Sequence, residues 1–169
     1  VTFYDYSGHI VKIQTVEHGS HATAPTLNSV LGRTQKGWTE DFSKVTKDLE
    51  VEPIYEVNTY EVIFYDIKGE QIGDVQVVKY DQAAEAPNQG LEVTGMNFIG
   101  WNQNFEHVTS DLHVYAQYED KMFTVVFKYN NLLIETKVVK YGATVRAPKH
   151  PTVEVYEEAG WDKELNYVT

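Results

Sequence analysis

Apolar and polar residues alternate along three short stretches of the chain, which lie about 60 residues apart. Period-2 spacing built from β-branched and aromatic residues predicts a β-strand with one buried face. The three stretches therefore predict three equivalent strands. Their apolar positions are Val1 and Phe3, Val62 and Phe64, and Val125 and Phe127.

A turn follows each predicted strand. Asp5 and Asp66 each stand three residues before a glycine, an order in which Asp accepts backbone N–H groups and Gly takes a positive φ. The third stretch has Asn130-Asn131, and Asn tolerates positive φ next best. We therefore expect three β-hairpins. Their return strands are predicted at 10–17, 71–80 and 132–141.

The sequence that follows each predicted hairpin also recurs. An Ala-Pro pair, which marks a loop or sheet edge, is followed by a variable segment without a clear helical period, where we expect at most a short helix. Next come a Gly-Trp pair and, seven residues after each Trp, a Val-Thr pair. A last alternating strand follows, at Leu112, Val114, Ala116 and Tyr118 in the second stretch. The three Trp are Trp38, Trp101 and Trp161.

This recurrence makes the chain a repeat array. Successive Trp residues are 63 and 60 residues apart, so one unit is about 61 residues long. We predict three domains and name them repeat 1 (1–58), repeat 2 (59–120) and repeat 3 (121–169). Repeat 3 has no counterpart of the final strand. We therefore expect repeat 3 to be truncated and the sequence to be a section of a longer array.

Composition supports a mainly β fold, α+β at most. The 169 residues include 12 Tyr, 7 Phe and 3 Trp, and aromatic residues favour strands. A net charge of −11 argues against a nucleic-acid partner, which needs clustered Lys and Arg. No apolar run is long enough for membrane insertion, and we expect any signal peptide to lie outside this sequence. Cysteine is absent, which excludes disulfides, thiolate zinc sites and a Cys nucleophile.

Candidate chemistry is sparse. His18 and His21 form the densest His group, but they follow a predicted strand end, where their rings point apart, so an ordinary exposed loop is favoured over a metal site. The Asp5 turn lacks the alternating oxygen ligands of a calcium loop. No phosphate loop, nucleophile elbow or zinc-protease motif occurs. We therefore expect no enzymatic activity, catalytic residue, cofactor or metal.

The aromatic residues allow two interpretations. The Gly-Trp sites could form carbohydrate-stacking platforms, but a core anchor is favoured because small domains have little area to bury. Several Tyr lie near the predicted hairpins, where they could contact a partner or form cross-strand pairs that stiffen the sheet. These are Tyr4, Tyr6, Tyr65 and Tyr129.

The combined pattern resembles the Listeria–Bacteroides repeat, the family that includes the internalin B-repeat. The resemblance covers three tandem copies and implies small β-grasp, ubiquitin-like modules without catalytic activity. It further implies secreted or wall-anchored proteins of Gram-positive and other bacteria, in which such modules act as spacers or auxiliary adhesion modules. Repeat 2 carries the motif at Val62, Phe64, Asp66, Gly69, Pro87, Gly100, Trp101, Phe105, Val108, Thr109, Asp111, Val114, Ala116 and Tyr118.

We therefore predict a non-enzymatic section of a bacterial cell-surface or secreted protein, extracellular or cell wall-anchored, forming an elongated, monomeric rod. Its role would be a spacer or stalk with possible adhesion. The alternatives are a direct binding module for a host glycan, mucin or receptor, or an accessory region of a secreted enzyme or phage surface protein. Partners compatible with this prediction are a host protein, a glycan or a cell-wall polymer.

Overall fold

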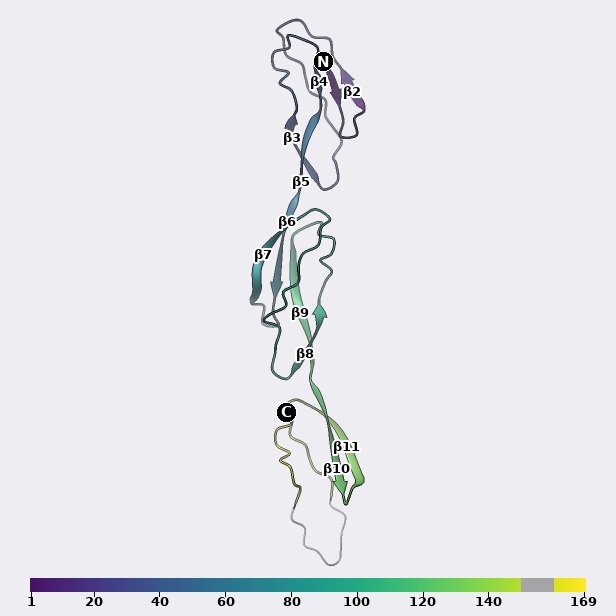
Figure 1. Ribbon diagram of the computed structural model, residues 1–169, viewed down its shortest axis with the longest axis vertical. Coiled ribbons are helices and arrows are strands. Elements are labelled where there is room, and N and C mark those ends of the chain that lie inside the picture. The colour runs from purple at the N-terminus through teal and green to yellow at the C-terminus, as the bar shows by residue number, and fades with distance from the viewer. Residues whose placement is uncertain (150–159) are drawn as a thin grey trace, which may run out of the picture. The chain divides into compact units, whose positions relative to one another are not determined.

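The computed structural model describes residues 1–149 and 160–169, and these ranges hold eleven β-strands and no helix (Figure 1). The prediction of a mainly β fold is confirmed. The short helix allowed after each Ala-Pro pair does not form in the described parts of these connections, which are irregular. The β-grasp arrangement stays a prediction.

The strands of residues 1–58 form two sheets. A three-stranded sheet has the order β2-β1-β4, in which β1 pairs antiparallel with β2 and parallel with β4. A second, antiparallel sheet pairs β3 with β5. The strands are β1 (Thr2–Tyr4), β2 (Ile10–Ile13), β3 (Arg33–Trp38), β4 (Glu50–Val51) and β5 (Pro53–Val57).

The remaining strands form two further sheets. One is four-stranded with the order β7-β6-β9-β8, and the other is the antiparallel hairpin of β10 and β11. Each sheet of the described chain lies within one of the ranges 1–58, 59–120 and 121–169. The strands are β6 (Thr59–Tyr65), β7 (Gln71–Lys79), β8 (Met96–Trp101), β9 (Leu112–Asp120), β10 (Met122–Tyr129) and β11 (Leu132–Lys140).

The hairpin turns have the predicted chemistry. One carboxylate oxygen of Asp5 accepts the N–H groups of Ser7 and His9, at 2.8 and 2.9 Å. Asp66 binds the second turn in the same way, and the third turn has Asn130 and Asn131 at φ 46° and 65°. The return strands β7 and β11 end one residue earlier than expected. Strand β2 is four residues shorter than the predicted 10–17. Val1 and Gln14 continue the pairing by one residue, because the Gln14 N–H donates to the Val1 carbonyl and the Val1 amino group donates to the Gln14 carbonyl.

One aromatic pair recurs in the three predicted repeats. The Phe of the first strand is buried, and the Trp of the Gly-Trp pair packs against it edge to face. This contact supports the core-anchor interpretation of the Trp residues. The pairs are Phe3–Trp38, Phe64–Trp101 and Phe127–Trp161, with ring centroids 5.4, 4.8 and 4.9 Å apart.

A recurrent set of backbone hydrogen bonds closes each repeat at the Val-Thr pair. A residue just past the return strand donates its N–H to the carbonyl of the Val, and the N–H of the Val donates to the carbonyl of the residue that directly follows this donor. These long-range bonds satisfy backbone groups that lie outside any sheet. The donor–acceptor pairs to the Val carbonyl are Gly19–Val45, Asp81–Val108 and Gly142–Val168, at 2.6, 2.8 and 2.7 Å.

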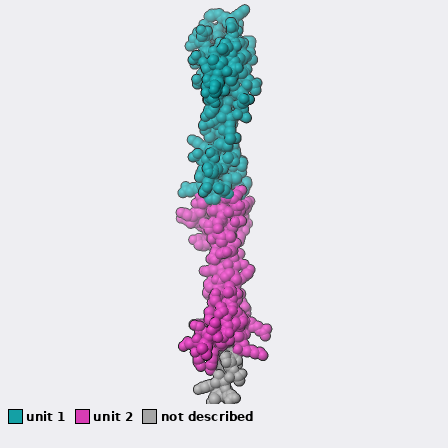
Figure 2. Space-filling view, turned by 90° about the vertical axis from the view of Figure 1, so that its right-hand side faces the viewer, with its two compact units in different colours: residues 1–63, 75–85, 104–113 teal, residues 64–74, 86–103, 114–169 magenta. Residues whose placement is uncertain are grey.

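The described chain also separates into two compact units (Figure 2). One comprises residues 1–63, 75–85 and 104–113, and its core is centred on Phe3 and Val51, which are fully buried. The other comprises 64–74, 86–103 and 114–169 and contains the β10–β11 hairpin. The boundary crosses strands of the four-stranded sheet, so these units are not single repeats, and the three-domain division stays a prediction.

Candidate functional site

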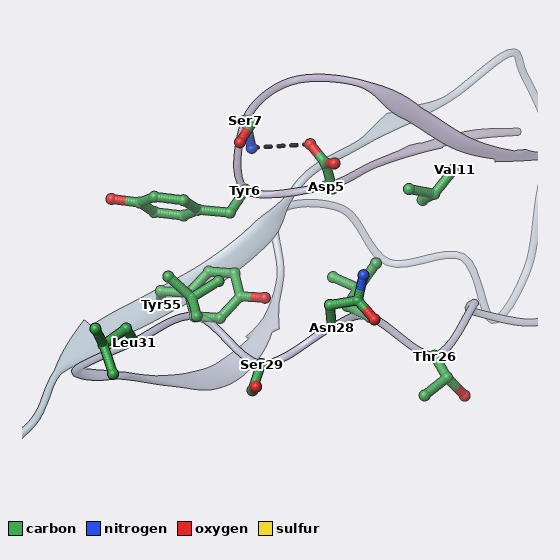
Figure 3. A pocket seen from close by; sticks show the side chains of 11 residues that line it. Asp5, Tyr6, Ser7, Val11, Thr26, Asn28, Ser29, Leu31 and Tyr55 are labelled. Atoms are coloured by element: carbon green, nitrogen blue, oxygen red, sulfur yellow. Dashed lines mark hydrogen bonds between the residues drawn. The ribbon is translucent and has the colours of Figure 1, made fainter.

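An open pocket of about 410 Å³ lies beside the first hairpin (Figure 3). Three segments that are distant in sequence build it: the turn between β1 and β2, the connection before β3, and strand β5. Polar and aromatic side chains share the lining. The lining residues are Asp5, Tyr6, Ser7, Val11, Thr26, Leu27, Asn28, Ser29, Val30, Leu31 and Tyr55.

Two tyrosines form the aromatic side of the pocket. Tyr6 lies on the turn and Tyr55 on β5, and their rings meet edge to face with centroids 5.3 Å apart. The guanidinium carbon of Arg33, on β3, lies 5.2 Å from the centroid of the Tyr6 ring, a cation–π distance. Tyr6 nevertheless remains 50% exposed. The pair therefore offers an accessible aromatic surface beside a positive charge.

Acceptors and donors occupy the other side. Hydrogen bonds from the backbone N–H groups of His9 and Ser7 hold the pKa of the Asp5 carboxyl below its ordinary value, His9 contributing most. Asp5 is therefore a carboxylate acceptor at neutral pH. The side chains of Thr26, Asn28 and Ser29 add hydroxyl and amide groups to the lining (Figure 3).

The lowered pKa of Asp5 predicts acid sensitivity of the first hairpin. Because the folded-state pKa lies below the unfolded one, the stabilisation is present above the ordinary carboxyl pKa of about 3.9 and disappears as pH falls through the folded value. We expect the difference in melting temperature between wild type and Asp5→Asn to shrink between pH 6 and pH 2.5. Thermal melts across this range measure it. An equal difference at both ends would contradict the prediction.

The residues around the aromatic side of the pocket differ in repeat 2. Ile67 stands at the position of Tyr6, and Phe98 at that of Gln35. Phe98 packs against Trp101 and Tyr118, with centroids 5.4 and 5.6 Å away. The Tyr118 hydroxyl is buried without a hydrogen-bond partner among the described residues, and desolvation is the main cause that raises its pKa. Tyr118, the counterpart of Tyr55, thus packs against Phe98, whereas Tyr55 faces Gln35.

The four tyrosines considered as contact residues have different surroundings in the structure. The hydroxyl of Tyr4 donates a 3.4 Å hydrogen bond to Glu50, and desolvation followed by this carboxylate raises the Tyr4 pKa. Tyr65 stacks on Tyr115 across the sheet, as the cross-strand interpretation proposed. Tyr129 lies half-exposed at the end of β10. Tyr6 lines the pocket described above. Its partner Tyr55 was missed, because Tyr55 lies on the last strand rather than near a hairpin.

Metal ligation was considered at one His group. His18 and His21 are both exposed. Within residues 1–149 and 160–169, no group of three or more His, Cys, Asp or Glu side chains is placed to hold a metal ion. The same ranges contain no helix long and apolar enough to span a membrane.

The recurrent hairpin, the Phe–Trp pair and the Val-Thr closure define a protein of tandem β-repeats. The sequence profile of the Listeria-Bacteroides repeat domain matches residues 60–117 and 123–169. The chain therefore belongs to the Listeria-Bacteroides repeat family. These matches cover repeats 2 and 3, so a third copy in residues 1–58 stays a prediction, as does the closer likeness to the internalin B-repeat.

Two relatives from Evansella cellulosilytica are similar over almost the whole chain. One, named "Putative membrane protein", is 30% identical over 95% of this chain and 27% of its own length. The other, named "Putative Gly-rich membrane protein", is 25% identical over 95% of this chain and 21% of its own length. The chain thus spans less than a third of these relatives, so it is similar to a section of each.

Proposed function

We propose that this chain is a non-enzymatic repeat section that acts as a spacer in a larger protein of the bacterial envelope. The observation that carries the proposal is the length of the linkers. Strand β5 ends at Val57 and β6 begins at Thr59, and β9 ends at Asp120 and β10 begins at Met122. A single residue between the last strand of one repeat and the first strand of the next favours a stiff connection over flexible beads.

The relatives support an envelope location. Both are named as membrane proteins, and this chain corresponds to only 27% and 21% of their lengths, which leaves other regions to provide an anchor and a head. An extracellular or wall-anchored position and a Gram-positive source belong to the same proposal. The lack of enzymatic activity is also proposed.

Deletion of residues 59–120 from the full-length protein tests the spacer role. On intact cells we expect the deletion to reduce antibody access to an epitope placed beyond the array, because the reach becomes shorter. Refilling the gap with a second copy of residues 1–58 that carries His18→Tyr, the residue of repeat 2 at this position, should restore access. Access that stays unchanged after the deletion, or that only the original residues 59–120 restore, would contradict a spacer.

A second candidate function is glycan binding at the pocket of repeat 1. It is favoured by the exposed Tyr6–Tyr55 pair next to the Asp5 carboxylate and the Asn28 amide. Aromatic faces accept the apolar faces of sugar rings, and flanking acceptors and donors bind their hydroxyl groups. A host glycan or a cell-wall polysaccharide has this chemistry.

Glycan arrays and pull-downs on purified cell wall test the second candidate. If it holds, Tyr6→Ala should lower binding about tenfold or more, which corresponds to about 1.4 kcal/mol. The matched control is Ile67→Ala, because Ile67 occupies the same turn position in repeat 2 and should leave binding unchanged. Equal effects of both variants, or no binding by the wild type, would exclude the pocket as a glycan site.

A further inference from the structure

Two glycines each contact the ring of a tyrosine that belongs to the following repeat. Gly32, just before β3, is buried and has φ 67°, and a Cβ built on it would lie 2.1 Å from Cδ1 of Tyr80. Gly95, just before β8, has φ 80°, and its Cβ would lie 2.7 Å from Cδ1 of Tyr141. Contacts this short exclude any side chain, so each ring fits directly against the glycine backbone.

The residue that links two repeats is bound to both members of this pair. The N–H of Asn58 donates to the carbonyl of Gly32 at 2.9 Å, and the carbonyl of Asn58 accepts the N–H of Tyr80 at 2.8 Å. Lys121 makes the same two bonds, from its N–H to Gly95 and from the N–H of Tyr141, both at 2.8 Å. Glycine, linker and tyrosine thus form one continuous hydrogen-bonded unit at both places.

Each unit of glycine, linker residue and tyrosine is a joint between two repeats, and side-chain contacts add to it. The hydroxyl of Thr34 donates to the side-chain oxygen of Asn58 at 2.7 Å, which fixes the first linker. At the second, the ammonium group of Lys140 pairs with the Asp120 carboxylate. These groups restrict the linkers further, although an exposed ion pair contributes little alone.

The closing hydrogen bond of a repeat forms without the tyrosine ring. In repeat 1 the corresponding residue is His18, which is exposed. The closing hydrogen bond next to it is nevertheless formed, because Gly19 donates to Val45 just as Asp81 donates to Val108. The backbone of a repeat therefore closes without the ring. Tyr141 also packs against Phe123 and Tyr167 of its own repeat, with ring centroids 6.3 and 5.6 Å away, and its contact with Gly95 adds a connection to the preceding repeat.

We propose that this glycine–tyrosine pair is an interlocking surface through which each repeat binds the next repeat of the same chain. The leading repeat supplies a glycine with an open backbone face, and the following repeat supplies a tyrosine at the end of its return strand. The pair determines which repeats dock in sequence. A side chain at the glycine position of the leading repeat, or the loss of the tyrosine ring from the following repeat, prevents the contact. A repeat that carries His at the tyrosine position, as repeat 1 does, provides no ring for a glycine ahead of it.

The test compares Gly95→Ala with Gly69→Ala. The two glycines have nearly the same φ, 80° and 83°, so the backbone strain from alanine is matched, but nothing lies within 4 Å of a Cβ at Gly69. We expect Gly95→Ala to speed trypsin cleavage after Lys121, and amide exchange of Lys121 and Tyr141, by about tenfold or more through local opening. Gly69→Ala should leave these rates within about twofold. Equal rates in the two variants would overturn the proposal.

A double variant separates the joint from general destabilisation. In a Tyr141→Ala background the ring is gone, so adding Gly95→Ala should change the exchange rates no more than adding Gly69→Ala does. An undiminished extra effect of Gly95→Ala would overturn the proposal. If Gly95→Ala fails to fold, the joint of Gly32, Asn58 and Tyr80 provides the test. Tyr80→Ala should then speed the amide exchange of Asn58 about tenfold, and no change there would count against the interlock.

Discussion

Phe3→Ala is expected to unfold repeat 1. Phe3 has no exposed surface and contacts Trp38 and Phe42 edge to face, with centroids 5.4 and 5.2 Å away. Truncation of a buried Phe to Ala costs about 3–5 kcal/mol, because transfer energy and packing are lost together. A domain of about 60 residues has a stability of only about 3–9 kcal/mol. The substitution therefore removes most or all of the stability of this repeat.

Urea denaturation followed by tryptophan fluorescence measures this loss. Each repeat carries one Trp, so a background with Trp101→Phe and Trp161→Phe reports on repeat 1 through Trp38 alone. The control is Leu31→Ala in the same repeat, since Leu31 is 82% exposed and should change stability by no more than about 0.5 kcal/mol. A Phe3→Ala protein with the denaturation midpoint of the control would refute the assignment of the core.

Trp101→Ala is expected to destabilise repeat 2 by about 3 kcal/mol, the lower end of the range for a large aromatic residue, because Trp101 is only partly buried. Its ring lies 4.8 Å from that of Phe64 and 5.4 Å from that of Phe98. Both neighbours lose an edge-to-face contact in the variant. The result distinguishes a core anchor from a carbohydrate-stacking platform, which would tolerate the change.

Chemical denaturation of Trp101→Ala and Trp101→Phe provides the comparison. Phenylalanine keeps an aromatic ring against Phe64, so we expect it to retain more than half of the lost stability. A Trp101→Ala protein that keeps wild-type stability but loses saccharide binding would instead establish the platform. Stability lost in the alanine variant and largely kept in the phenylalanine variant is the outcome that packing predicts.

Local chemistry explains which elements could be predicted. Strand β1 and its turn follow from alternation at Phe3 and from an Asp and a Gly spaced for one turn, all within eight residues. The irregular connection after it depends on distant partners. The N–H of Ala22 donates to the carbonyl of Phe42 at 2.9 Å, so this segment satisfies its backbone across the repeat rather than in a helix. Sequence periodicity contains no signal for such a bond.

The pocket and the glycine–tyrosine contacts between repeats were harder to predict, because they also depend on residues that are distant in sequence. Tyr6 was considered because it lies near a hairpin, but its partner Tyr55 is defined by the register of β3 and β5, in which Gln35 faces Tyr55. The recurrence of Tyr80 and Tyr141 at strand ends was visible in the sequence. Their glycine partners were not, because Gly32 meets Tyr80 only after two repeats have folded.

Small-angle X-ray scattering of the intact chain tests most directly the central claim, that these repeats form a stiff spacer. A single compact domain of 169 residues has a radius of gyration of about 15 Å. Docked repeats in tandem predict a value well above this, with a distance distribution that has a long tail and a constant maximum dimension across salt concentrations. A radius of gyration of about 15 Å would contradict the account.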